Sequence, residues 1–182
     1  MLESNESTFV EAWSSDGRFI LYVKAGITWA LPLEGDRKPV KILRGSRSEI
    51  SPNGRWVAYE FRQSGPPEVY VQSFPKSGGN WQVSTAGGRE PHWRKDGKEL
   101  FYLEGNKLMA VEVKTDMPAF EAGARKALFE MPLGANDERN RYQVAAKGER
   151  FSGSLTSGTA GVFPHYGGDE LAIGSEEMNL SD

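Results

Sequence analysis

The chain has 182 residues, a formal net charge of −3 and no cysteine. This length supports one domain with its own core, and the absence of a basic excess argues against nucleic-acid binding. Without cysteine, disulfides and thiolate metal sites are excluded. No apolar run approaches the ~20 residues that span a membrane, and the acidic, polar start lacks a signal-peptide pattern. We therefore expect no membrane insertion and, for the chain as given, a cytoplasmic location.

The first predicted element is a hairpin that turns at Asp16-Gly17. Both residue types favour tight turns, and glycine adopts positive φ without steric cost. The aromatic and β-branched run after the turn is typical of a buried strand. Two further strands are predicted over residues 28–33 and 39–43, so that the first unit contains four strands.

The same hairpin returns along the chain. It turns at Asn53-Gly54, at Asp96-Gly97 and, more weakly, at Gly148, where no acidic residue precedes the glycine. These glycines are separated by 37, 43 and 51 residues, which is close to the ~40–45 residues of a propeller blade. Additional strands are predicted over residues 68–74, 81–84, 107–113 and 126–129. Four strands per repeat is the composition of a propeller blade.

The repeat resembles the TolB-like, WD40-like (PD40-type) β-propeller repeat, and is closest to the C-terminal propeller region of bacterial serine/threonine protein kinases. The resemblance rests on residues 51–59, 67–75, 81–88, 90–103 and 107–113. It implies an all-β fold, a partial β-propeller with three clear four-stranded blades and a degenerate fourth. The blades are expected around residues 9–45, 46–88, 89–132 and 133–151, the last being incomplete.

Residues 152–182 differ from the repeats. They contain five acidic residues and no Lys or Arg, so this segment carries −5 and the rest of the chain carries −3 − (−5) = +2. The stretch that follows Phe151 is rich in Gly and Ser, which is typical of a flexible linker. We therefore expect an acidic, flexible tail.

The acidic turn residues invite comparison with calcium ligands. Loop calcium sites need several closely spaced oxygens, whereas Asp16, Asn53 and Asp96 each stand alone before a glycine. Turn chemistry is the favoured interpretation, because Asp and Asn side chains bond to their own turn backbone. We predict no metal and no cofactor, and a structural role for these residues and for Gly17, Gly54, Gly97 and Gly148.

Arg89, Glu90 and His92 form the candidate binding segment. If the family arrangement holds, this strand runs beside the central channel, where propellers tend to bind partners; the alternative is an ordinary solvated rim. A catalytic role for His92 is not favoured, because no G-x-S-x-G elbow accompanies it. The five tryptophans are expected to be mostly core.

The sequence therefore predicts a non-catalytic propeller module for protein interaction or ligand sensing, within a larger protein such as a propeller-bearing serine/threonine kinase. The kinase motifs themselves do not occur in this chain. The alternatives are a substrate-filtering propeller of a prolyl-oligopeptidase-like hydrolase and a non-functional remnant. The partner, a protein or a small ligand, is not identified. Because open propeller edges invite pairing, self-association is a further expectation, and a membrane-anchored parent would place the module outside the cytoplasm.

Overall fold

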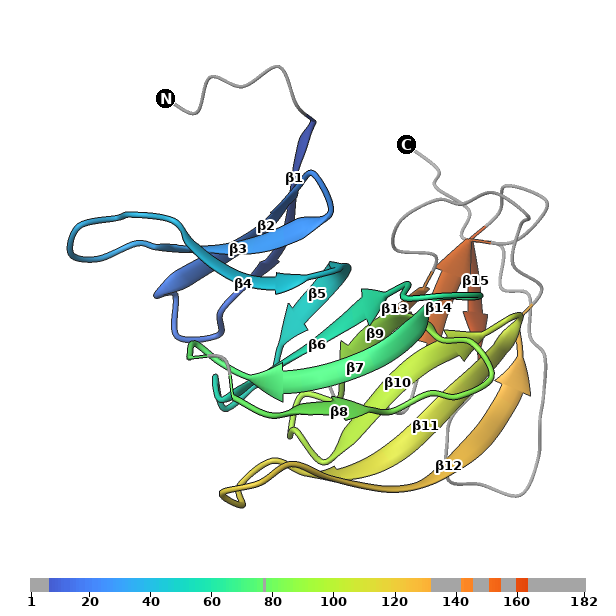
Figure 1. Ribbon diagram of the computed structural model, residues 1–182. Coiled ribbons are helices and arrows are strands. Elements are labelled where there is room, and N and C mark those ends of the chain that lie inside the picture. The colour runs from blue at the N-terminus through green and yellow to red at the C-terminus, as the bar shows by residue number, and fades with distance from the viewer. Residues whose placement is uncertain (1–6, 77, 132–141, 146–150, 155–159, 164–182) are drawn as a thin grey trace, which may run out of the picture.

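The computed structural model describes residues 7–76, 78–131, 142–145, 151–154 and 160–163, and its regular structure in these residues is entirely β (Figure 1). Four antiparallel sheets follow one another along the chain. The first sheet contains β1 (Thr8–Trp13), β2 (Phe19–Lys24), β3 (Ile27–Pro32) and β4 (Val40–Arg44). The second contains β5 (Ser46–Ile50), β6 (Trp56–Phe61), β7 (Glu68–Ser73) and β8 (Asn80–Gln82). The third contains β9 (Arg89–Trp93), β10 (Glu99–Glu104), β11 (Lys107–Lys114) and β12 (Glu121–Glu130). The fourth contains β13 (Tyr142–Val144), β14 (Phe151–Ser154) and β15 (Ala160–Phe163).

The sheets are arranged like a fan around their first strands. Strand β1 contacts β5, β5 contacts β9, and β9 contacts β13, while β4, β8 and β12 lie at the opposite edges of their sheets. Figure 1 shows the sheets following one another in chain order, with the first sheet at one end. No helix in the described part of the chain could cross a membrane. The first strands thus form an inner rim.

The three clear hairpin turns share one geometry. Gly17, Gly54 and Gly97 have φ of 73°, 70° and 71°, and each donates its amide hydrogen to the carbonyl oxygen three residues earlier. The preceding Asp or Asn does not take positive φ. Instead its side chain accepts the amide hydrogen of the residue after the glycine, at 3.0–3.1 Å. Gly148 lies outside the described residues.

This acceptor role lowers the pKa of the turn carboxyls. The backbone amide of Arg18, the hydroxyl of Ser14 and the guanidinium of Arg18 lower the pKa of Asp16 to about 2. Arg94 lowers the pKa of Asp96 through hydrogen bonds to both carboxylate oxygens. The turn carboxyls accept hydrogen bonds from their own turn backbone. Among the described residues, no group of three or more acidic or histidine side chains is placed to hold a metal ion.

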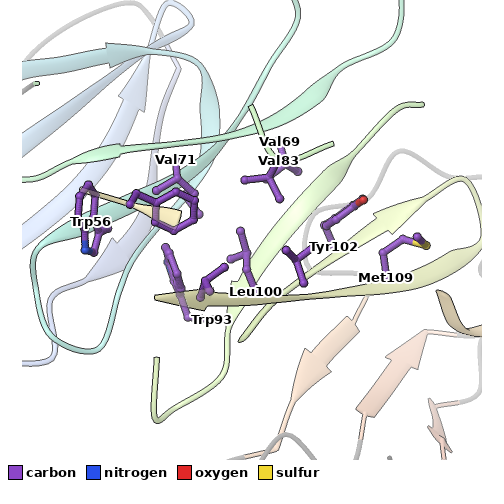
Figure 2. Packing of buried hydrophobic residues seen from close by; sticks show 12 residues of the cluster. Trp56, Val69, Val71, Val83, Trp93, Leu100, Tyr102 and Met109 are labelled. Atoms are coloured by element: carbon purple, nitrogen blue, oxygen red, sulfur yellow. The ribbon is translucent and has the colours of Figure 1, made fainter. Parts of the chain in front are cut away.

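Alternate residues of the central strands pack on opposite neighbours. In β6, Trp56 and Ala58 face the third sheet, whereas Val57 and Tyr59 face the first. The cluster between the second and third sheets includes Trp93 (Figure 2). A further cluster joins the third sheet to the fourth through aromatic and aliphatic residues: Phe101, Leu103, Leu108, Tyr142 and Phe151. Strands buried on both faces explain the continuous apolar runs in the sequence.

One glycine makes the abrupt link between the first two sheets. Gly45 alone separates β4 from β5, and its φ is 152°. A Cβ atom there would lie 2.7 Å from the Glu60 carbonyl oxygen and 2.7 Å from the Tyr59 ring. The link between the first two sheets is therefore achieved by close backbone approach, which only glycine permits.

Two expectations differ from the structure. Trp13 is 64% exposed, whereas Trp56 and Trp93 are buried, because no described sheet covers the side of the first sheet that Trp13 faces. Strands β14 and β15 extend beyond Phe151 into the segment expected to be a linker. They pair with each other, because a backbone with few bulky side chains can still satisfy its hydrogen bonds in a sheet.

Candidate functional site

The candidate site lies on the inner rim, where the first strands of the first three sheets each carry a bulge. Register shifts occur between Val10 and Ala12 in β1, between Ser46 and Glu49 in β5, and within β9 opposite Phe101 and Leu103. Arg47 and Glu90, each six residues before its turn Asn or Asp, both have a φ of 52°. Positive φ at a non-glycine residue costs about 1–3 kcal/mol and is commonest at functional sites, and a bulge re-aims side chains.

Carboxylates join neighbouring first strands. Glu11 of β1 accepts the amide hydrogens of Arg47 at 2.5 Å and of Ser48 at 3.1 Å in β5. Glu49 of β5 contacts His92 Nδ1 at 2.6 Å and accepts the Trp93 amide hydrogen at 3.3 Å in β9. Arg47 and Ser48 lie within the register shift of β5, so that a carboxylate on the preceding sheet accepts their amide hydrogens.

Two more contacts fix the rim. The Arg47 guanidinium bonds to both carboxylate oxygens of Glu60, at 3.0 and 2.9 Å, which is the strong bidentate form of an ion pair. The Tyr142 hydroxyl donates to the Glu90 carbonyl oxygen at 2.8 Å. All four sheets thus contribute to a rim whose side chains are held in place.

A small hollow of about 60 Å³ opens at this rim. Its charged lining consists of Glu11, Arg47, Glu49 and Glu90, with His92 beside them. Since Arg47 is paired with Glu60, the lining has an excess of negative charge. The hollow is acidic although the residues before the tail carry a small positive charge.

Two of the three predicted site residues line the hollow. Glu90 is 3% exposed and His92 is partly exposed. Arg89 lies on the same strand, β9, but does not line the hollow. Glu11 and Glu49 line it and were not predicted, although their positions four or five residues before an Asp/Asn-Gly turn were visible in the sequence.

The Glu49–His92 pair has part of the geometry of a catalytic dyad. Glu49 contacts Nδ1 as an orienting acid would. The Nε2 atom, however, is buried without a hydrogen-bond partner, and the edge of the ring meets Tyr142, with 4.7 Å between ring centroids. Within the described part of the chain, no nucleophile is hydrogen-bonded to this nitrogen.

A larger hollow of about 580 Å³ lies beside the Asp96-Gly97 turn. Its charged lining is largely paired: Arg94 lies 2.5 Å from Glu99 and 2.7 Å from Asp96, and Lys114 lies 2.7 Å from Glu121. These pairs raise the pKa of Arg94 and of Lys114. The lining of this larger hollow also contains more carboxylates than cationic side chains, so both hollows have a formal excess of negative charge.

Comparison with known proteins supports the fold. No family model matches the chain, and no curated protein matches its sequence significantly. Among solved structures, a putative TolB from Agrobacterium tumefaciens superposes with a TM-score of 0.66 and 21% identity, covering 88% of this chain and 58% of that one. The Cps50 (Swd1) β-propeller domain of Myceliophteria thermophila gives 0.60 and 12%, covering 90% and 54%. This chain has a partial β-propeller fold.

The predicted fold class is thereby confirmed, with three four-stranded sheets and a smaller fourth. A third similar structure, a putative 6-phosphogluconolactonase from Bacteroides uniformis, gives a TM-score of 0.55 and 16% identity, covering 88% of this chain and 52% of that one. The chain thus spans about half the length of these three propeller-like proteins. At such identities the likeness describes the fold alone.

Proposed function

We propose that this chain is a non-catalytic propeller module that binds a protein partner through its inner rim. The observation that carries the proposal is the small acidic hollow at the bulged rim, held by contacts among all four sheets. Small-molecule sites usually have about 300–1,000 Å³, far more than the 60 Å³ measured here. A water occupies about 30 Å³, so the hollow accommodates the end of one side chain.

The charge of the rim defines the partner's chemistry. Three carboxylates, those of Glu11, Glu49 and Glu90, line the hollow with one guanidinium, that of Arg47, which is paired with Glu60. A Lys or Arg side chain from the partner would therefore be attracted, and complementary charge gives specificity and a faster association. The partner proposed is a protein segment with an exposed basic residue.

The non-catalytic part of the proposal is supported by the surroundings of His92. Acid–base catalysis needs a reacting group within hydrogen-bond reach of the base, and the free ring nitrogen is enclosed beside Tyr142. The fold does not decide this point, because two similar structures are described as putative 6-phosphogluconolactonases and another as the tricorn protease.

Fluorescence anisotropy with a labelled arginine-rich peptide tests the rim. We expect saturable binding that weakens about tenfold with Glu49→Gln and weakens as salt rises, because screening reduces charge attraction. Asp36→Asn is the matched control, since this exposed carboxylate lies in the β3–β4 loop and pairs with Lys38. Equal affinity of the two variants, or tighter binding of a neutral peptide, would contradict the proposal.

Ligand sensing is the second candidate, and the larger hollow favours it. Its 580 Å³ lies within the usual range for small ligands, and the Arg94–Glu99 pair offers both a donor and an acceptor. Thermal-shift screening against small zwitterionic compounds tests it. A compound that raises the melting temperature of the chain but not of Glu99→Gln would favour this candidate over the rim.

The larger protein is proposed to be a serine/threonine kinase, with the propeller outside the membrane and the kinase inside. The sequence resemblance alone supports this origin. The alternative parent is a prolyl-oligopeptidase-like hydrolase, and a non-functional remnant is the third reading. The genomic neighbourhood of the reading frame tests them: kinase motifs upstream support the first, and a G-x-S-x-G domain downstream supports the second.

A further inference from the structure

The first sheet has an apolar face that is only partly covered. Its Leu21 and Ala30 pack on the second sheet, and the residues that alternate with them point to the other side. Cross-strand pairing aligns two rows there, listed from β1 to β3: Trp13–Ile20–Leu31 and Val10–Tyr22–Trp29. Val10 is 71% exposed and Trp13 is 64% exposed, whereas Tyr22, between Val10 and Trp29, is 7% exposed. Trp29 Nε1 is buried without a hydrogen-bond partner. The exposed part of this face is centred on Trp13 and Val10, and exposed apolar side chains grouped in this way mark an interaction surface.

The same row is covered in the next two sheets. The positions of Trp13–Ile20–Leu31 are taken by Ile50–Val57–Gln72 in the second sheet and by Trp93–Leu100–Val111 in the third. These residues are 7%, 0% and 6% exposed in the second sheet and 5%, 0% and 1% exposed in the third. In each case the preceding sheet provides the cover. The open row of the first sheet therefore has the character of an inter-sheet interface.

The covered rows also show what such a face contacts. The Trp93 indole donates to the Glu49 carbonyl oxygen on the preceding sheet at 3.0 Å. Trp13 stands three residues before Asp16, as Trp93 does before Asp96. Glu49 stands four residues before Asn53 of the second repeat. Gln143 stands four residues before Lys147 of the fourth repeat, so it occupies the position of Glu49 in the fourth sheet. Gln143 is exposed.

We infer that a second copy of this chain covers this face, with Trp13 of each copy against Gln143 of the other. Two copies would contribute eight sheets, within the ~4–8 blades of closed propellers. The chain spans 58%, 54% and 52% of three solved propeller-like proteins, so that two copies match one ring in size. The two contacts are related by a two-fold axis, the commonest symmetry of soluble oligomers. This inference concerns the chain as given and does not rest on the proposed rim function. It is the alternative to the larger protein proposed above, in which further blades of the same polypeptide would cover this face.

Paired single-cysteine variants test the arrangement, because the chain has no native cysteine. Val10→Cys leaves Trp13 intact. Val10 has the same position in the first sheet as Arg47 has in the second, and the Arg47 amide donates to Glu11 on the first strand of the preceding sheet. Chains carrying Val10→Cys are mixed with tagged chains carrying Gln143→Cys and treated with a short bismaleimide. We expect a covalent heterodimer from the mixture and little product from either variant alone.

A second substitution distinguishes this contact from random collision. Adding Trp13→Arg to the Val10→Cys chain should reduce the yield of heterodimer at least tenfold. Met117→Arg is the matched control, because Met117 is 48% exposed on the third sheet's β11–β12 connection, and it should leave the yield unchanged. Circular dichroism checks that both variants keep their β-structure. No heterodimer, or cross-linking of Val10→Cys only to itself, would overturn the inference.

Discussion

The second and third sheets differ from the first in one respect that their sequences do not reveal. Trp93 and Trp13 occupy the same position relative to an Asp-Gly turn, yet Trp93 is 5% exposed and Trp13 is 64% exposed. The difference lies in the neighbour. Trp93 packs on the second sheet and donates to its Glu49 carbonyl, whereas no described sheet precedes Trp13.

This comparison shows that a propeller repeat specifies a blade and both of its interfaces at once. A sheet with two apolar faces needs a neighbour on each side. The first sheet has apolar residues on both faces, and on the face away from the second sheet Val10 and Trp13 are exposed. Substitutions at matched positions can therefore measure how much stability depends on the neighbouring sheet.

The largest expected effect comes from truncating the two tryptophans. Trp93→Ala should lower the free energy of unfolding by about 3–5 kcal/mol, because it removes a buried aromatic side chain and leaves a cavity. Trp13→Ala should change it by about 0.5 kcal/mol or less at a dilution where the chain is monomeric. Urea unfolding followed by tryptophan fluorescence measures both, and equal losses would break the comparison.

The link between the first and second sheets should be nearly as sensitive. Gly45→Ala combines positive φ with close contacts to Glu60 and Tyr59, and should cost about 1–3 kcal/mol. Gly105→Ala is the control, because its φ is 59° but an added Cβ meets no atom within 4 Å. It should cost about 1 kcal/mol, from backbone strain alone. A smaller loss for Gly45→Ala than for the control would be inconsistent with this account.

A hydroxyl in the second turn should have a moderate effect. Ser51 is fully buried, and its Oγ accepts the amide hydrogen of Trp56 at 3.0 Å. Ser51→Ala leaves that buried amide without its partner, at a cost of about 1–2 kcal/mol. Chemical denaturation measures the loss, and Ser15→Ala, at an exposed position in the first turn, serves as the comparison. Similar values for both would contradict the proposed role of burial.

The smallest effect concerns acid. The folded-state pKa of Asp16 is lowered to about 2, so its contribution is present above the ordinary pKa of 3.8 and is lost as the pH falls toward 2. Asp16→Asn should flatten the decline in stability between about pH 4 and pH 2, as measured by thermal melts across this range. An unchanged pH dependence would show that the turn carboxylate is not stabilised by folding.

The sequence was sufficient for the elements whose causes are local. The Asp/Asn-Gly turns, the apolar runs and their period of about 40 residues predicted the sheets, because turn chemistry and strand alternation act over a few residues. The positive φ of Gly17 and its counterparts followed from the same reasoning, although the Asp and Asn residues contribute through their side chains and not through positive φ.

Contacts between sheets were harder to predict from the sequence. Arg89, Glu90 and His92 were predicted near the rim, but Glu11 and Glu49 were missed because their partners lie 36 to 44 residues away. The exposure of Trp13 was missed because it depends on which sheet lies next to it and not on the residues around it in the sequence. The extension of strands beyond Phe151 was missed because Gly and Ser carry almost no strand signal.

The most direct test of the half-ring account is the native mass of the purified chain, measured by light scattering after size exclusion at several concentrations. The account predicts a closed pair with twice the 20.1 kDa mass of one chain. A mass of 20.1 kDa at every concentration, or a series of growing assemblies without a closed pair, would contradict it.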